Sequence, residues 1–347
     1  MGAFFVLNYF IILSYLICHK LFVLCSGTML HTCLYCGYVQ YFAENFYAQI
    51  FIFFSFSKIA ICTGCRYNGL MKILIRPHDI GKGSAEFLGQ KAHEWGFDGV
   101  QLAIAKAIEG QNGNPGTLTD RVVSEIRRGF NSNGVEIPLL GAYFNPVHSN
   151  KEKVKLGAEK YADHLRHAAE FGAKFVASET GSYNDDKWTY NPKNQTEEAF
   201  AEVKSIFAPM PEIAKKNGVC MALEGAWGHC MYCPEQLKRL ADEIDPGQEN
   251  FRFIVDIYNY LYIGNHEKRA EIFERCLKLF KGKICGFHLK DYVVKNGELE
   301  IAPLGQGIMG WKEFLPVIAK KEPNAYLIFE GVKNVPDSLE FVRSIVG

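Results

Sequence analysis

Short apolar runs alternate with longer stretches of helical period from Met71 to the end of the chain. The apolar runs are rich in β-branched residues and predict strands at Lys72–Arg76, Gly99–Ala103, Ile137–Tyr143, Phe175–Glu179, Cys220–Glu224, Phe251–Asp256, Ile284–Leu289 and Tyr326–Glu330. The stretches between them predict helices at Ser84–Trp95, Leu118–Ser132, Val154–Phe171, Glu197–Asn217, Pro234–Ile244, Glu267–Phe280, Trp311–Lys320 and Asp337–Ile345.

Strands that alternate with helices imply parallel pairing and right-handed crossovers. Eight such units fit a closed barrel, which takes about 250 residues. The alternative is an open doubly wound sheet, which usually carries a G-x-G-x-x-G turn after its first strand. Here the first strand runs into Pro77-His78-Asp79, and Gly81-Lys82-Gly83 lacks the third glycine. We therefore expect an α/β fold, a (β/α)8 TIM barrel.

Residues 1–70 differ sharply in composition from the rest of the chain. They are dense in Phe, Tyr, Ile, Leu and Cys, and their charged residues are few: Lys20, Glu44, Lys58 and Arg66. The chain therefore divides into an atypical hydrophobic, Cys- and Phe-rich segment, 1–70, which does not read as a domain, and a barrel over residues 71–347.

Three interpretations of the first segment compete. The apolar run Phe4–Cys18 resembles a membrane anchor, although a span needs about 20 residues and the basic flank of a signal peptide is missing. The C-x-x-C pairs Cys33–Cys36 and Cys62–Cys65 have the spacing of zinc ligands, but 25 residues separate them. We prefer a third interpretation, in which the start codon is set too early and Met71 is the natural N-terminus. A chain that starts at Met71 should then fold and be enzymatically active.

The charge balance and the cysteines narrow the class of protein. Lysine plus arginine and aspartate plus glutamate both number 38 in the 347 residues, so the net charge is zero. A nucleic-acid-binding face needs clustered excess Lys and Arg, and we expect no nucleic-acid partner. Of the 11 cysteines, the five beyond residue 70 are scattered, which is typical of a reduced, cytoplasmic enzyme. Membrane association is expected only if residues 1–70 are a real anchor.

Polar residues close several of the apolar strands. In a (β/α)8 barrel the active site forms at the carboxyl ends of the strands. Glu224, Asp256, His288 and Glu330 end four consecutive strands and would surround one point at the barrel mouth. Three carboxylates and one imidazole suit Mn²⁺ best, with Mg²⁺ or Co²⁺ as the alternatives, and they suit these ions better than they suit a thiolate-type zinc site.

Each of these residues also has a purely structural interpretation. A single carboxylate could pair with Lys290 or Arg252, and His288 alone could be a packed core histidine. Buried charges are normally paired or bound to a cation. Because all four residues recur at the same height of the barrel, we favour a shared metal site over four separate structural roles.

Five short motifs carry a family resemblance: L-E-G at Leu223–Gly225, V-D at Val255-Asp256, H-L-K-D at His288–Asp291, P-L-G-Q-G at Pro303–Gly307 and F-E-G at Phe329–Gly331. From about Met71 to the C-terminus the chain resembles the sugar phosphate isomerase/epimerase family with the xylose isomerase-like barrel. That group includes ketose 3-epimerases, hydroxypyruvate isomerase and inosose dehydratase, and is related to endonuclease IV. The resemblance implies that the four strand-end residues bind a divalent metal and that Glu224 and Glu330 are also the catalytic acid/base pair. Homo-oligomers are common in this family.

One departure from the family leaves the substrate open. Members often carry D-x-x-H after the sixth strand, with a histidine that helps to bind substrate oxygens, whereas here the stretch ends in Asn259. The candidate substrate-binding residues are Arg76, His78, Glu179, His229, Asn259 and Lys290. Gly305-Gln-Gly307 could hold a phosphate on its backbone N–H groups or form a simple tight turn.

The expected function is a metal-dependent isomerisation or epimerisation of a sugar or sugar phosphate through an enediolate, with two glutamates moving the proton. The main alternative is an inosose-type dehydratase on the same site. An endonuclease IV-like DNA repair enzyme would need a histidine-rich multi-metal cluster and a basic face. A non-catalytic sugar-binding barrel, tethered or not to a membrane, is the remaining alternative.

Overall fold

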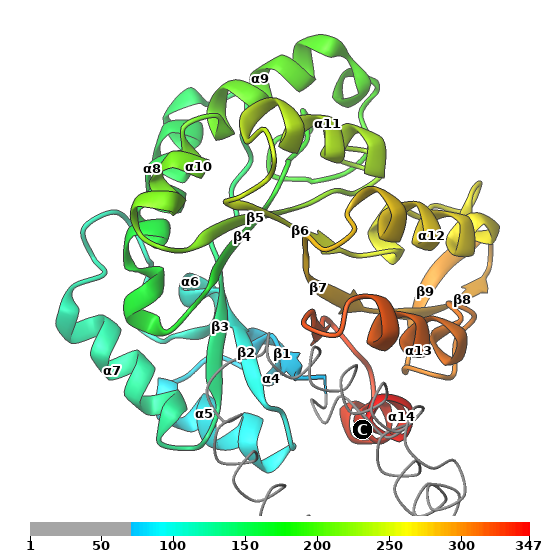
Figure 1. Ribbon diagram of the computed structural model, residues 1–347, viewed down its shortest axis with the longest axis horizontal. Helices are drawn as coiled ribbons and strands as arrows, with labels where there is room; N and C mark the ends of the chain where they lie inside the picture. Colours follow the sequence, from blue (N-terminus) through cyan, green and yellow to red (C-terminus); the bar gives the residue numbers. More distant parts are fainter. Residues whose placement is uncertain (1–70) are drawn as a thin grey trace, which may run out of the picture. The chain divides into compact units, whose positions relative to one another are not determined.

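The computed structural model describes residues 71–347, and the interpretations of the first 70 residues lie outside the described part of the chain. Eight parallel strands close into a barrel in the order β1-β10-β7-β6-β5-β4-β3-β2 (Figure 1). They are β1 (Ile73–Ile75), β2 (Gly99–Leu102), β3 (Glu136–Gly141), β4 (Phe175–Glu179), β5 (Cys220–Glu224), β6 (Phe251–Val255), β7 (Ile284–Leu289) and β10 (Tyr326–Phe329). The expected (β/α)8 TIM barrel is confirmed.

Helices surround the strands on the outside of the barrel (Figure 1). The principal ones are α5 (Ala85–Glu94), α7 (Asp120–Asn131), α8 (Lys151–Phe171), α9 (Glu197–Phe207), α10 (Met210–Lys216), α11 (Pro234–Ile244), α12 (Arg269–Leu279), α13 (Trp311–Lys321) and α14 (Val335–Val346). Shorter helical turns, which the sequence pattern did not predict, are α4 (Pro77–Ile80), α6 (Ile104–Ala107), η2 (Pro192–Gln195), η3 (Tyr258–Tyr260) and η4 (His266–Lys268).

One helix prediction was wrong. The stretch Glu197–Asn217 forms two helices, α9 and α10, with a break between Phe207 and Met210. Pro209 and Pro211 lack the backbone N–H that a helix interior uses, and their rings clash with the preceding turn. Both helices bury apolar residues, so the apolar pattern continues through the break and periodicity alone did not show it.

Local sequence explains where the helices start and stop. The side chain of Ser84 accepts a hydrogen bond from the backbone of Phe87 at the start of α5, and Asn150 does the same for Glu152 at the start of α8. Such caps satisfy backbone donors that have no partner within the helix. Gly172 ends α8 in the left-handed conformation, with φ of 83°, as a glycine just beyond a helix commonly does.

A two-stranded antiparallel hairpin interrupts the regular alternation after β7. Its strands are β8 (Asp291–Lys295) and β9 (Glu298–Ala302), and it lies at the edge of the barrel (Figure 1). The turn uses Asn296 and Gly297, both with positive φ, which is the pair preferred in two-residue hairpin loops. This hairpin was not among the predicted elements, although Asn-Gly between apolar residues is a hairpin signal.

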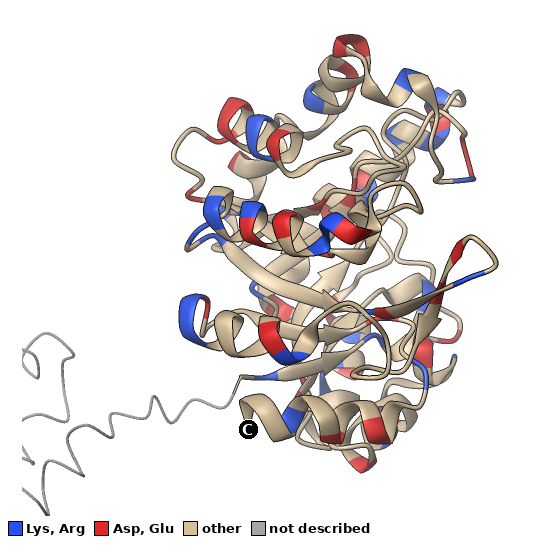
Figure 2. Ribbon diagram, turned by 90° about the vertical axis from the view of Figure 1, so that its right-hand side faces the viewer, with Lys and Arg blue, Asp and Glu red and all other residues tan. Residues whose placement is uncertain are grey.

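The barrel interior is a packed core rather than a channel. Side chains from all but one of the strands fill it: Leu74, Leu139, Ala177, Ala222, Ile254, Cys285, Tyr326 and Ile328. A larger apolar layer fills the space between the strands and the helices. Lys, Arg, Asp and Glu are interspersed along the outer helices (Figure 2). Within residues 71–347, the helices are all too short or too polar to cross a bilayer.

Candidate metal centre and substrate cavity

Four side chains meet at the carboxyl ends of the strands. Glu224 ends β5, Asp256 follows β6, His288 lies in β7 and Glu330 follows β10. One donor atom from each lies within 4.8 Å of the donor atoms of the other three. The structure thus brings together the four residues that the sequence grouped, because parallel neighbouring strands carry them to the same height.

The donor atoms of this cluster fit a divalent cation. Glu224 Oε2, Asp256 Oδ2 and His288 Nδ1 are buried, and their polar neighbours are one another, Glu330 and Lys290. His288 Nδ1 lies 3.0 Å from Glu224 Oε2 and 2.7 Å from Glu330 Oε2. Buried carboxylates this close together are costly unless cations compensate their charge. Three carboxylates and one imidazole nitrogen match the preference of Mn²⁺, Mg²⁺ or Co²⁺.

Two residues that were not predicted from the sequence support the imidazole. Gln101 on β2 accepts a hydrogen bond of 2.8 Å from Nε2 of His288. The amide nitrogen of Gln101 in turn donates to the hydroxyl of Tyr143, at 2.6 Å. Gln101 is 1% exposed, and a glutamine inside the otherwise apolar run Gly99–Leu102 was the available signal.

Two cations lie against the carboxylates. Lys290 Nζ is 2.7 Å from Asp256 Oδ2 and 2.8 Å from Glu330 Oε1. Arg76 Nη1 is 2.7 Å from Glu330 Oε1, and the same guanidinium pairs with Asp79. Burial by itself raises the pKa of Glu330, but His288 and Lys290 outweigh it and hold that pKa well below its usual range. Burial raises the pKa of Asp256 to about 6 although Lys290 acts against it.

Asn259 links three members of this network. Its amide nitrogen donates to Glu224 Oε1 at 2.6 Å, and its oxygen accepts from Lys290 Nζ at 3.0 Å. Its backbone N–H donates to Asp256 Oδ1 at 3.0 Å. Both ends of the Asn259 amide are therefore occupied by protein groups, and the residue fixes the orientation of one carboxylate and one ammonium group.

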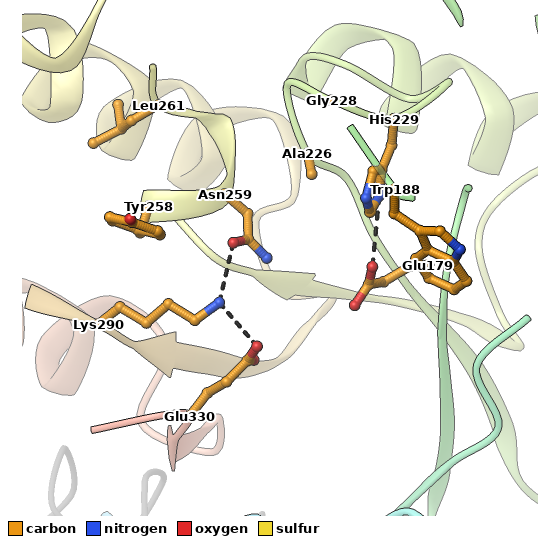
Figure 3. A pocket seen from close by; sticks show the side chains of 10 residues that line it. All are labelled: Glu179, Trp188, Ala226, Gly228, His229, Tyr258, Asn259, Leu261, Lys290 and Glu330. Atoms are coloured by element: carbon orange, nitrogen blue, oxygen red, sulfur yellow. Dashed lines mark hydrogen bonds and ion pairs between the residues drawn. The ribbon is translucent and has the colours of Figure 1, made fainter. Parts of the chain in front are cut away.

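A cavity of about 310 Å³ opens beside the cluster. Lys290, Asn259 and Glu330 form one wall, and Glu179, His229 and Trp188 lie opposite them (Figure 3). Tyr258, Leu261, Ala226 and Gly228 complete the lining. The cavity therefore has polar side chains on two opposite sides, with Tyr258 and Leu261 beyond Lys290 and Asn259, and Ala226 and Gly228 near His229 (Figure 3).

The wall opposite Lys290 and Asn259 is built on one acid and one imidazole, and the acid, Glu179, is in register with Glu224 on the neighbouring strand. Glu179 Oε2 lies 3.6 Å from His229 Nδ1, and the Trp188 ring packs edge-on against the imidazole at 5.6 Å between centroids. Burial, with the nearby carboxylates of Glu224 and Glu330, raises the pKa of Glu179 to about 8. Burial lowers the pKa of His229 to about 4, so its imidazole is neutral near pH 7.

The predicted substrate residues divide into two groups. Glu179, His229, Asn259 and Lys290 line the cavity, whereas Arg76 and His78 are not among its lining residues. Arg76 contacts Glu330, and His78 lies on α4, where burial and the charge of Arg76 lower its pKa to about 4. Direct substrate contact by any of the six stays a prediction.

The glycine-rich motif after β9 is a turn rather than a phosphate cradle. The N–H groups of Gly305 and Gly307 both donate to Oδ2 of Asp291, at 2.9 and 3.1 Å. Gln306 N–H closes the turn on the carbonyl of Pro303 at 3.1 Å. A carboxylate of the chain itself thus takes the position that an external anion would need, and the tight-turn alternative is the correct one.

A closed (β/α)8 barrel with a buried carboxylate–histidine cluster at the carboxyl ends of its strands defines an enzyme-like class of protein. The chain belongs to the family of xylose isomerase-like TIM barrels, whose sequence profile matches residues 90–345. No curated protein matches it significantly in sequence.

Solved structures share the fold at low sequence identity. A xylose isomerase-like TIM barrel protein from Mycobacterium smegmatis, in complex with magnesium, is 14% identical, with a TM-score of 0.62 over 80% of this chain and 96% of that one. A D-tagatose 3-epimerase-like protein is 20% identical, with a TM-score of 0.60 over 80% and 100%. The probable 3-DHS dehydratase AsbF from Bacillus anthracis is 16% identical, with a TM-score of 0.58 over 79% and 98%.

Proposed function

We propose that this chain is a divalent-metal-dependent isomerase or epimerase that acts on a sugar. The convergence of Glu224, Asp256, His288 and Glu330, with one buried donor atom from each within 4.8 Å of the others, is the observation that carries the proposal. The D-tagatose 3-epimerase-like neighbour supports it at the level of fold.

These four residues would hold the ion. Mn²⁺ is the metal that we favour, and Mg²⁺, reported for the M. smegmatis relative, or Co²⁺ would suit the same donors. A bound divalent ion supplies Lewis-acid stabilisation of the negative charge that develops on a substrate carbonyl when a neighbouring carbon loses its proton.

Glu224 and Glu330 are the proposed acid/base pair. Their Oε2 atoms both face Nδ1 of His288, at 3.0 and 2.7 Å, so the two carboxylates approach the same point from different strands. One carboxylate removes the carbon-bound proton and leaves an enediolate; the other delivers a proton. Delivery to the opposite face of the same carbon is epimerisation, and delivery to the neighbouring carbon is isomerisation. Catalysis of this kind contributes about 10²–10⁴-fold.

The surrounding residues hold this pair in place. Asn259 fixes Glu224 through its amide nitrogen, and Lys290 and Arg76 fix Oε1 of Glu330. Oriented in this way, each glutamate keeps its second oxygen, Oε2, directed into the cluster, where the proposed proton transfer takes place. Precise orientation of this kind lowers the entropy cost of the reaction.

A dehydratase is the second candidate. Glu179 and His229 form a further pair of proton-carrying groups on the opposite wall of the cavity, from which a proton could pass to a departing hydroxyl. The neighbouring structure of a probable 3-DHS dehydratase is consistent with such a reaction on this fold.

The test combines metal analysis with exchange of solvent deuterium into a panel of ketoses by the Mn²⁺-loaded full chain. Exchange without loss of water supports an isomerase or epimerase, whereas release of water supports the dehydratase. Glu330→Gln should abolish turnover while metal binding is weakened but detectable. Full activity in that variant would rule out the scheme. Glu322→Gln is a matched control, because Glu322 is also buried but accepts a hydrogen bond from Gly282 outside the cavity lining.

A further inference from the structure

Three aromatic rings form a continuous stack beside the cavity. The ring centroids of Tyr190 and Trp227 are 5.5 Å apart, with 4° between the ring planes, and those of Trp227 and Tyr262 are 4.3 Å apart, with 18° between the planes. The three residues come from the loops that follow β4, β5 and β6. This stack, which we call the aromatic rim, therefore joins three loops at the carboxyl ends of neighbouring strands.

The aromatic rim is continuous with the cavity. Each of its residues is one or two positions along the chain from residues that line the cavity, which are Trp188, Ala226, Gly228 and Leu261 (Figure 3). The backbone N–H of Trp227 also donates to the carbonyl of Asn259, another lining residue, at 2.8 Å. A ligand that fills the cavity and extends beyond it on this side meets the rim.

The rim exposes large apolar side chains close together. Tyr190 is 47% exposed and Tyr262 is 37% exposed, and Ile263, next to Tyr262, is 47% exposed. Trp227 packs against one face of each tyrosine ring, so the exposed area of the tyrosines lies away from it. Apolar side chains that are exposed as a group, rather than singly, commonly mark a binding surface.

Asparagine side chains hold the backbone of the rim in place. Asn184 Nδ2 donates to the carbonyl of Tyr190 at 3.0 Å, and Asn265 Oδ1 accepts from the N–H of Tyr262 at 2.7 Å. Tyrosine and tryptophan offer a large contact area and lose little conformational entropy on binding, because each side chain has two torsions. A rim with a fixed backbone is thus organised before a ligand arrives, which lowers the cost of binding.

The size of the cavity indicates which part of a ligand would reach the rim. Its volume of about 310 Å³ is at the lower end of the range of about 300–1,000 Å³ for small-molecule sites, which suits a single sugar unit. A group attached to that unit has to lie outside the cavity. The C–H groups on the face of a sugar ring are apolar, and their burial against an aromatic ring is favourable.

We propose that the substrate carries a second, non-reacting sugar ring, joined by a glycosidic bond to the sugar in the cavity, and that this second ring stacks on the aromatic rim. This inference rests on the function proposed above and selects disaccharides and other glycosides within its class of substrates. Contacts to a remote part of a substrate supply binding energy that can be used at the reacting centre.

The first experiment measures solvent-deuterium exchange by the Mn²⁺-loaded full chain into matched ketoses. The glucosyl ketoses maltulose and isomaltulose are compared with the fructose O-methyl ethers substituted at the same oxygens, which lack the second ring. We expect kcat/KM to be about 3–10-fold higher for a glucosyl ketose than for its methyl ether, the size of one aromatic stacking contact. Equal or lower values for both glucosyl ketoses would overturn the inference and leave the proposed function standing. Absence of exchange into every compound would count against both.

The second experiment assigns this advantage of the glucosyl ketose to the aromatic rim. Tyr190→Ala and Tyr262→Ala should each reduce it to less than about 2-fold, whereas Tyr190→Phe, which keeps the ring, should retain it. Trp95→Ala is the matched control, because Trp95 is 36% exposed at the end of α5 and outside the cavity lining, and it should retain the full advantage. An unaltered advantage in both alanine variants, each folded by circular dichroism, refutes the assignment.

Sedimentation of the same variants separates a bound sugar ring from a second copy of this chain on the rim. A reduced advantage with the oligomeric state of the parent supports the inference. If Tyr190→Ala and Tyr262→Ala dissociate an oligomer of the parent and leave the advantage unaltered, the rim is a contact between copies and the inference is overturned.

Discussion

Gln101 and His288 meet across the inside of the barrel mouth, where Oε1 of the glutamine accepts a 2.8 Å hydrogen bond from Nε2 of the histidine. This bond requires a proton on Nε2, and Nδ1 of the same ring faces Oε2 of Glu224 and Oε2 of Glu330. A metal-binding histidine generally gives its second ring N–H to such a partner, which fixes both tautomer and ring orientation. Gln101 is therefore the positioning residue of the candidate metal centre.

Replacing Gln101 by Met should weaken Mn²⁺ binding about 10–100-fold, because loss of such a supporting partner typically has that effect. The measurement is calorimetric titration of the metal-free protein with Mn²⁺. Gln90→Met, on the exposed face of α5, is the control and should bind as the parent does. Unchanged affinity in Gln101→Met would show that the hydrogen bond does not orient the ligand.

Binding of Mn²⁺ should also stabilise the fold. A ligand that binds only the folded state at 100 times its Kd adds about 2.7 kcal/mol, which for a barrel of this size is a rise of roughly 5–10 °C in Tm. We expect this rise in the parent and in Glu322→Gln, and its loss in Asp256→Asn, whose buried Oδ2 belongs to the cluster. Scanning calorimetry with and without the metal measures it. An equal rise in Asp256→Asn would place the bound ion elsewhere.

The strands and the four cluster residues were predictable because a parallel barrel buries its strands on both faces. Such strands are short apolar runs, and a carboxylate such as Glu224 that closes one is conspicuous. Predicted and observed bounds agree for β4, β5 and β7. The register of neighbouring strands then brings the strand ends to one height, so residues far apart in sequence could be grouped before their contacts were known.

The hydrogen bonds that orient the cluster residues could not be predicted in the same way. Gln101 and His288 are 187 positions apart and lie on β2 and β7, which are not neighbours in the barrel. Their contact depends on side-chain direction across the mouth rather than on any local pattern. The sequence around Asn259 likewise did not show that its side-chain amide forms hydrogen bonds with Glu224 and Lys290. Those contacts arise from the turn that η3 makes after β6.

The buried carboxylate of Asp291 organises the loop between the hairpin and α13. Oδ1 and Oδ2 accept hydrogen bonds from the backbone of Tyr292, Gly305, Gly307 and Met309. Asp291→Asn replaces one acceptor by a donor that faces backbone N–H groups. Since hydrogen bonds to a charged group contribute about 1.5–3 kcal/mol, we expect a loss of at least about 2 kcal/mol in the free energy of unfolding, measured with urea.

Two comparisons accompany this prediction. Asp120→Asn, at the exposed start of α7, should cost less than about 1 kcal/mol. Gly307→Ala should destabilise in the same direction as Asp291→Asn, because a Cβ at Gly307 would clash with Oδ1 of Asp291. If Asp291→Asn and Asp120→Asn had equal effects, the loop would not depend on the buried carboxylate.

His164 on α8 should make the fold sensitive to acid. Its Nδ1–H donates to the carbonyl of Lys160 at 2.8 Å, while Nε2 is buried without a partner. Burial lowers the pKa of His164 from 6.5 to about 4. The unfolded chain therefore binds this proton more readily, so the free energy of unfolding should decrease as the pH falls from about 6.5 to about 4, with no further decrease from this residue below that range.

Between pH 7 and pH 5 this residue should account for about 2 kcal/mol of lost stability. We expect urea unfolding of His164→Gln to show a correspondingly smaller decrease over that interval, whatever its stability at pH 7. His167→Gln, one turn further along α8 and more exposed, should retain the full decrease of the parent. If His164→Gln and the parent lost the same free energy between pH 7 and pH 5, the acid sensitivity would have to arise from other buried groups, such as His78 and His229, whose pKa values burial also lowers.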